Sequence, residues 1–141
     1  MTLAERSDAV TRSREVVLGY HRDIDAGHAT AAIDAFTDDA EFQAHGRLLR
    51  GSTEILGFLT AREANTDRKT LHVFANETVT EQGSDAIELR ALVVIHVQQP
   101  AGHYLVENAV DLVHHLVKTD GEWKISHRHS SRLHPAPEGK K

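Results

Sequence analysis

The chain has 141 residues, of which 40% are hydrophobic and 26% charged, and this balance predicts one globular domain that can bury a core. Its 16 basic residues are outnumbered by 21 acidic ones, which gives a net charge of -5. A chain with this charge has no basic field for a phosphate backbone, so we expect no nucleic-acid partner. The absence of cysteine excludes disulfides, thiolate nucleophiles and thiolate metal sites.

The hydropathy pattern argues against a membrane partner. No apolar run approaches the ~18 residues that a membrane-spanning helix needs. The N-terminal residues also lack the apolar core of a secretory signal sequence. We therefore expect a cytoplasmic protein.

Helical periodicity marks the beginning of the chain. Apolar residues spaced by seven, three and four predict an amphipathic helix over residues 7–27, capped by Ser7 or Asp8 and ended by Gly27. The apolar stripe of this helix is formed by Val10, Val17, Tyr20 and Ile24.

Two further helices and a strand follow. A short helix is predicted from Thr30, as its N-cap, to Phe36, and residues 40–44 alternate as a strand does. The chain then turns towards a third helix, which Ser52 is expected to cap and which carries Phe58 on its apolar face.

After residue 66 the apolar pattern changes to period two. Four strands with short turns between them are predicted: Leu71–Gln82, Ala86–Gln98, Tyr104–Val117 and Glu122–Arg132. Helices followed by an antiparallel meander define an α+β fold. We expect one domain over residues 1–133, with helices covering the concave side of a curved sheet around a blind pocket, and a disordered tail over residues 134–141.

One strand carries the first candidate site. His72, Phe74 and Asn76 alternate along Leu71–Gln82 and are predicted to share a face. An imidazole beside apolar surface can exchange protons near neutral pH, as an acid–base pocket requires. The alternative is a half-buried histidine bonded to a backbone carbonyl.

Four segments, taken with the order of the elements, resemble the nuclear transport factor 2-like (NTF2-like) superfamily over about residues 10–132, and its SnoaL-like branch most closely. They are Phe36-Thr37-Asp38-Asp39-Ala40-Glu41-Phe42, the turn from Gly46 to Gly51, Thr70-Leu71-His72 and Asp120-Gly121-Glu122-Trp123-Lys124-Ile125. This resemblance implies a cone-shaped α+β barrel with a mostly antiparallel sheet. The superfamily includes dehydratases, isomerases, cyclases, epoxide hydrolases, dioxygenase small subunits and non-enzymatic binders, so the fold does not define the activity.

A narrower resemblance assigns catalytic roles. Asp25 on the first helix and His72 are similar to the carboxylate and histidine of scytalone dehydratase, bile-acid dehydratase and hexachlorocyclohexane dehydrochlorinase. The resemblance implies that Asp25 orients His72, that His72 removes a proton from carbon or polarises a carbonyl, and that Tyr20 bonds a substrate oxygen. His96 is similar to a second histidine of scytalone dehydratase. The basic residue that precedes the dehydrochlorinase's aspartate has no clear counterpart in His21 or Arg22.

The remaining candidates would contact substrate. Asp111 lies near the position where relatives have a polar pocket residue, although a shift of strand register would replace it with Leu112 or Val113. The other expected substrate-binding residues are Phe58, Phe74, Asn76 and Val94.

These residues predict a cofactor-independent dehydratase, isomerase or cyclase that acts on a small hydrophobic oxygenated molecule through an Asp25–His72 dyad. One alternative is a non-catalytic ligand-binding or accessory subunit, similar to a dioxygenase small subunit. Another is an epoxide hydrolase or epoxide-opening cyclase, which would need Asp111 or Glu107 in the cavity.

Histidines also cluster near the C-terminus. His114 and His115 are adjacent on a strand and must face opposite ways, whereas His127 and His129 share a face. No spacing among them is diagnostic of a metal, so we predict no metal site. The resemblance implies instead that this face of the sheet packs between the protomers of a homodimer.

Overall fold

The computed structural model describes residues 1–44, 46–134 and 137, and it places helices before strands as the sequence predicts. The helical elements are α1 (Leu3–Asp25), the 3-10 helix η1 (Ala29–Ala35) and α2 (Gly51–Ala64). The strands are β1 (Phe36–Ala44), β2 (Arg47–Arg50), β3 (Thr70–Glu81), β4 (Ala86–Gln98), β5 (Tyr104–Thr119) and β6 (Glu122–Arg132). The segment predicted to be a disordered tail lies mostly outside the described residues.

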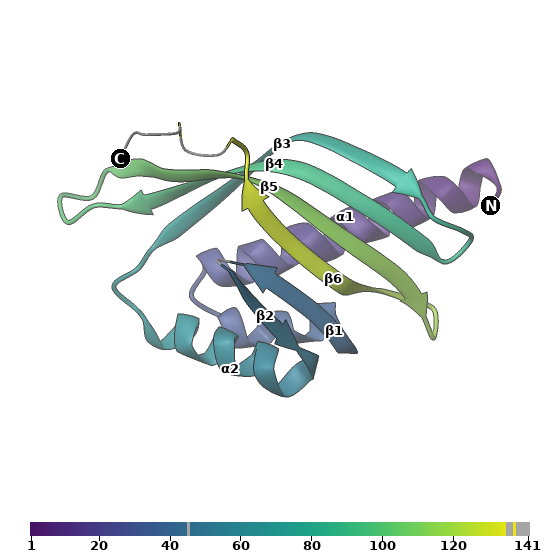
Figure 1. The fold of residues 1–141 in the computed structure, drawn as a ribbon, viewed down its shortest axis with the longest axis horizontal. Coiled ribbons are helices and arrows are strands. Elements are labelled where there is room, and N and C mark those ends of the chain that lie inside the picture. Colours follow the sequence, from purple (N-terminus) through teal and green to yellow (C-terminus); the bar gives the residue numbers. More distant parts are fainter. Residues whose placement is uncertain (45, 135–136, 138–141) are drawn as a thin grey trace.

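The strands form one six-stranded sheet in the order β2-β1-β6-β5-β4-β3. Neighbouring strands are antiparallel except β1 and β6, which run parallel. The sheet arches over the molecule, α1 runs along its inner face, and α2 lies at the opposite side of the molecule beside β1 and β2 (Figure 1). The predicted α+β class with helices packed on a mostly antiparallel sheet is confirmed, but the sheet stays open, with β2 and β3 as its edges.

Helix α1 begins earlier than predicted. Thr2, not Ser7 or Asp8, is its N-cap, because the Thr2 hydroxyl accepts from the Glu5 amide and the Glu5 carboxylate accepts from the Thr2 amide. The buried stripe of the helix consists of Ala9, Ser13, Val17, Tyr20, His21 and Ile24. This stripe brings two polar rings, as well as aliphatic groups, against the sheet.

The next two helices also differ from the prediction in their first residues. Residues 29–35 form a 3-10 helix, and Thr30 does not cap it but donates its hydroxyl to Glu63 of α2 at 2.9 Å. Helix α2 has no side-chain cap, and Ser52 contacts the Asp38 carbonyl at 3.4 Å. The chain enters α2 through Gly51, whose positive φ of 78° suits a residue without Cβ.

Bulges interrupt the alternation of the sheet at functionally important places. One extra residue in β3, between Ala75 and Thr78, contains Asn76 at φ 53°. Another extra residue in β6 lies opposite the step from His115 to Leu116 of β5. On β3 the inward-facing side chains have even residue numbers before the bulge and odd numbers after it, and on β6 the order is reversed. The sequence pattern alone does not reveal this change.

No helix within the part of the chain described is long and apolar enough to cross a membrane.

The bulge in β3 makes a testable prediction. Asn76→Val should lower the free energy of unfolding by about 1–2 kcal/mol, since a β-branched residue is strained at positive φ. Asn76→Gly should be close to neutral, because glycine adopts this conformation without strain. Urea denaturation of both variants checks the difference, with Thr78→Val, an exposed position in the same strand, as the control. Equal stability of the valine and glycine variants would contradict it.

Candidate functional site

A cavity of about 480 Å³ lies between the C-terminal half of α1, α2 and the inner face of the sheet. This volume is typical of a small-molecule site. Its apolar wall includes Ile24, Phe42, Phe58, Val93, Ile95 and Leu112. Of the residues predicted to contact substrate or act in catalysis, Phe58, Tyr20 and His72 lie in this wall.

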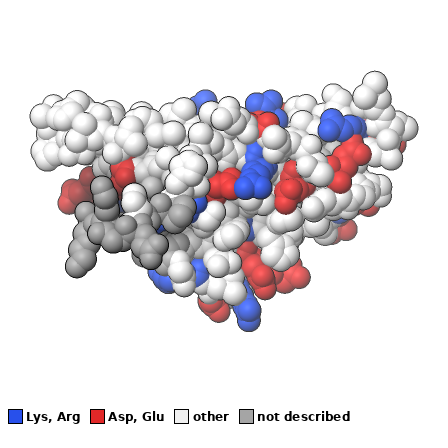
Figure 2. Space-filling model, turned by 45° about the horizontal axis from the view of Figure 1, so that its top comes forward, with Lys and Arg blue, Asp and Glu red and all other residues white. Residues whose placement is uncertain are grey.

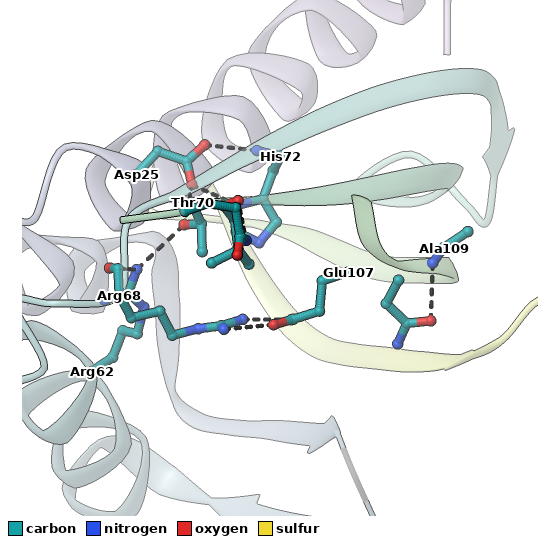
Figure 3. Close-up of polar contacts among 10 residues, drawn as sticks. Asp25, Arg62, Arg68, Thr70, His72, Glu107 and Ala109 are labelled. Atoms are coloured by element: carbon teal, nitrogen blue, oxygen red, sulfur yellow. Dashed lines mark hydrogen bonds and ion pairs between the residues drawn. The ribbon is translucent and has the colours of Figure 1, made fainter. Parts of the chain in front are cut away.

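Asp25 and His72 are bonded to each other at the edge of the cavity (Figure 3). Asp25 Oδ1 lies 2.6 Å from His72 Nδ1, and Oδ2 accepts from the His72 backbone amide at 2.9 Å. The Thr70 hydroxyl donates to Oδ1 at 2.7 Å. An ionised Asp25 can only accept, so Nδ1 carries the proton and Nε2 is the nitrogen available as a base.

The environment of Asp25 keeps it ionised. Burial raises the pKa of its carboxyl, but the hydrogen bonds from His72 and Thr70 outweigh burial and bring the pKa below its ordinary value of 3.8. Near neutral pH the carboxylate is therefore charged.

Arg128 is the functional candidate that the sequence patterns missed. The bulge in β6 turns it inward, where it is 8% exposed and lines the cavity. Its guanidinium carbon lies 5.1 Å from the ring centroid of Tyr20 and 4.7 Å from that of Phe42. Burial lowers the pKa of Arg128, but a guanidinium stays protonated in proteins, so this cavity contains a buried cation.

His21 of α1 holds the guanidinium of Arg128 in place with a hydrogen bond. Its Nδ1 lies 2.8 Å from the Val17 carbonyl and donates to it, which leaves Nε2 to accept from Arg128 Nη2 at 3.0 Å. Burial, and then the charge of Arg128, lower the pKa of His21 well below 6.5. His21 therefore acts as a neutral acceptor for the Arg128 guanidinium.

Tyr20 lines the cavity as predicted, and burial raises the pKa of its phenol despite the opposing charges of Arg128 and Arg62. It remains a neutral hydrogen-bond donor near neutral pH. Its ring packs edge-on against Phe36 and His21, with centroids 5.5 Å and 4.6 Å apart.

Other predicted residues lie outside the cavity. On β4 the inward positions are odd-numbered, so Val93 and Ile95 line the wall, whereas Val94 and His96 belong to the outer face. Asp111 is also on the outer face, where it pairs with Arg90. The predictions of Val94, His96 and Asp111 as pocket residues were wrong by one position of strand register.

The face shared by His72, Phe74 and Asn76 ends at the bulge. Phe74 points inward, but its ring packs on His21 at 4.6 Å between centroids and is not part of the cavity wall. Asn76 is exposed within the bulge and does not reach the cavity.

The outer histidines pair with carboxylates instead of converging. The rings of His115 and His127 are 5.8 Å apart, and their Nε2 atoms lie 3.7 Å from Glu88 and 3.5 Å from Glu41. Across residues 1–44, 46–134 and 137, no group of three histidine, aspartate or glutamate side chains is placed to hold a metal ion.

The model of the SnoaL-like domain matches residues 5–129, which is most of the chain. The protein belongs to the SnoaL-like family. This membership, together with the NTF2-like neighbours below, confirms the resemblance found in sequence. No functionally curated protein matches the chain in sequence.

Solved structures share the fold at low sequence identity. An NTF2-like protein with a cystatin-like fold from Novosphingobium aromaticivorans is 20% identical, with TM-score 0.79 over 94% of this chain and 84% of that one. A candidate scytalone dehydratase from the same organism is 17% identical, with TM-score 0.76 over 99% of both chains. A candidate aromatic ring hydroxylase, also from that organism, is 23% identical, with TM-score 0.76 over 89% of both chains. At these identities the similarity shows the fold alone.

His114 makes the stability of the protein depend on pH. It is fully buried on β5, and neither ring nitrogen has a hydrogen-bond partner among the described residues. Burial lowers its pKa well below 6.5, so the folded protein holds it neutral while the unfolded chain binds a proton. Stability is complete above the unfolded pKa and falls as the pH drops below 6.5 towards the folded pKa.

The free energy of unfolding of the wild type should fall as the pH is lowered, and His114→Leu should make this slope shallower by up to about 1.4 kcal/mol per pH unit. Urea denaturation at several pH values between neutral and about pH 5 measures this slope. The control is His103→Leu, because the side chain of His103 is exposed. A slope that is the same in the His114 variant and the wild type would contradict the prediction.

Proposed function

We propose that the protein is a cofactor-independent acid–base enzyme, a dehydratase, isomerase or cyclase that acts on a small hydrophobic oxygenated molecule. The observation that carries this proposal is the 2.6 Å contact between Asp25 and His72 at the wall of an apolar cavity. A carboxylate in this position fixes the tautomer and the orientation of the imidazole, as a positioned general base requires.

In the proposed reaction, His72 Nε2 removes a proton from a carbon next to a carbonyl. Asp25 stabilises the imidazolium that forms. In a dehydration, the carbon–oxygen bond then breaks, and the imidazolium returns its proton to the departing hydroxide as water. In an isomerisation the same proton goes to another carbon. His72 thus serves as both base and acid, because His96, the second histidine implied by the resemblance, belongs to the outer face and does not line the cavity.

Arg128 and Tyr20 would stabilise the negative oxygen of the intermediate. The guanidinium of Arg128 lies over the Tyr20 ring, and both residues line the cavity with His72. His21 lies between His72 and Arg128, since its ring centroid is 5.1 Å from that of His72 and its Nε2 accepts a hydrogen bond from Arg128. A preorganised cation near a developing enolate lowers the barrier, because it needs no reorganisation during the reaction.

The alternatives have less support from the geometry. An epoxide hydrolase of the predicted kind needs Asp111 or Glu107 at the cavity, but Asp111 pairs with Arg90 on the outer face and Glu107 pairs with Arg68. Neither carboxylate lines the cavity wall. A non-catalytic accessory subunit does not require a carboxylate bonded to a histidine inside a cavity.

The dyad can be tested after a panel of hydroxy-ketones and unsaturated ketones has identified a substrate. His72→Ala and Asp25→Asn should each lower kcat by about 10²–10⁴, because each removes the positioned base or its orienting charge. The matched control is Asp23→Asn, a carboxylate on the same helix that does not line the cavity with His72. Full turnover by His72→Ala would disprove the proposed chemistry.

We also infer a homodimer formed through the outer face of the sheet. Leu71 and Val73 on β3 are 44% and 49% exposed, and Val106 on β5 is 62% exposed. Leu71 and Val106 both pair with His96 of β4 in the register, so they flank this strand on either side and share its outer face. In Figure 2 this side shows wide uncharged stretches, including the end of the β4–β5 hairpin at the left.

Light scattering after gel filtration should give a mass near twice that of one chain. Val73→Asp should shift the protein to a monomer, since a charge buried in an apolar interface is unfavourable. Leu56→Asp is the control, because Leu56 is similarly exposed but belongs to α2. A monomeric wild-type protein, or an unchanged mass for Val73→Asp, would contradict the inferred interface.

A further inference from the structure

The charge of the cavity wall is opposite to that of the whole chain. The chain has a net charge of -5, but no aspartate or glutamate among residues 1–44, 46–134 and 137 lines the cavity. Four arginines line it: Arg47, Arg62, Arg68 and Arg128. A cavity with this wall attracts anions and disfavours cations.

Two of these arginines are satisfied by the protein itself. Arg62 donates from Nη2 to the Arg68 carbonyl at 3.0 Å and to the Thr70 hydroxyl at 3.3 Å. Arg68 forms a two-pronged ion pair with Glu107, with both nitrogen–oxygen distances at 2.7 Å (Figure 3). Both guanidinium groups shape the wall, but protein oxygens already accept most of their hydrogen bonds or balance their charge.

The other two arginines have neither an acidic partner nor a protein oxygen bonded to the guanidinium among the described residues. Among the residues that the structure describes, the guanidinium of Arg128 bonds His21 and lies over two aromatic rings, and its Nε has no hydrogen-bond partner there. Arg47 on β2 is exposed and forms no hydrogen bond or ion pair through its side chain with any described residue. One cation without a counter-charge is thus buried in the cavity, and the other lies at its solvent-exposed side. Buried charges in proteins are normally paired, so the partner of Arg128 is expected to come with the ligand.

We propose that the ligand is a hydrophobic carboxylic acid whose carboxylate binds Arg47 and whose carbonyl or hydroxyl oxygen binds Arg128. This inference rests on the proposed function, because it places the reacting carbon beside His72. A planar guanidinium matches a carboxylate with two parallel hydrogen bonds. The aromatic and aliphatic wall, including Phe42, Phe58 and Ile95, encloses the apolar body. Arg47 thus selects the substrate, whereas Arg128 stabilises the charge that forms during the reaction.

Binding of matched probes tests the proposal without a known substrate. Calorimetry should show that 2-naphthoate binds the wild-type protein at least tenfold more tightly than neutral 2-naphthamide, which has nearly the same shape. Arg47→Gln should weaken 2-naphthoate about fivefold or more and leave 2-naphthamide unchanged. The control is Arg50→Gln, because Arg50 is on the same strand but pairs with Glu41 outside the cavity wall.

Several outcomes would overturn the proposal. They are equal binding of the acid and the amide, no binding of 2-naphthoate at millimolar concentration, and an equal effect of the Arg47 and Arg50 variants. Tighter binding of 2-naphthyl phosphate would replace the carboxylate with a phosphate.

His72→Ala separates this inference from the enzymatic proposal. The variant should keep the preference for 2-naphthoate, because the selectivity comes from Arg47. If the His72→Ala variant keeps both the preference for 2-naphthoate and the full turnover of the wild type, only the catalytic proposal is refuted. A lost preference in an active enzyme would refute the anion site alone.

Discussion

The bond between Asp25 and the beginning of β3 organises this molecule. Asp25 is the last residue of α1, and its carboxylate accepts from the Thr70 hydroxyl, the His72 amide and the His72 ring. These three bonds hold the end of the first helix against a strand more than 40 residues later in the sequence. The same carboxylate therefore closes one side of the cavity and sets the tautomer of the proposed base, which couples the packing of α1 to the chemistry.

Polar groups in the interior form a second connected unit around Arg128. Its guanidinium is held by His21 and by the faces of Tyr20 and Phe42, and the His21 ring also contacts His72. Burial keeps His21 neutral, so it accepts from Arg128 and does not repel it. A cation without a carboxylate partner is unfavourable inside a protein, and a ligand oxygen that carries negative charge would compensate for it.

Register shifts interrupt four of the strand pairs, and the bulges in β3 and β6 are the two that move charged side chains between the faces of the sheet. The bulge in β6 brings Arg128 into the cavity and leaves His127 outside beside Glu41. The bulge in β3 ends the row begun by Thr70 and His72 and turns Glu77 inward to pair with Arg14 of α1. After each bulge, the inward-facing residues change between odd and even numbers. One charged side chain therefore faces inward where the neighbouring residue would do so in a regular strand.

The pairing of Asp25 with His72 was implied by the family resemblance, not by the local pattern, and the two side chains are in contact in the structure. The sequence by itself determined the order of helices and strands and the α+β class, because periodicity is a local property of the chain. It also identified Tyr20 and Phe58, which lie on regular helices whose buried stripe follows directly from their spacing. Only the tertiary structure decided strand register and bulges. For that reason Val94, His96, Asp111 and Asn76 were expected in the cavity and lie outside it, whereas Arg128 was overlooked. A shift of one residue reverses the face of a strand side chain, and this shift depends on pairing between strands distant in sequence, not on the residues of one strand.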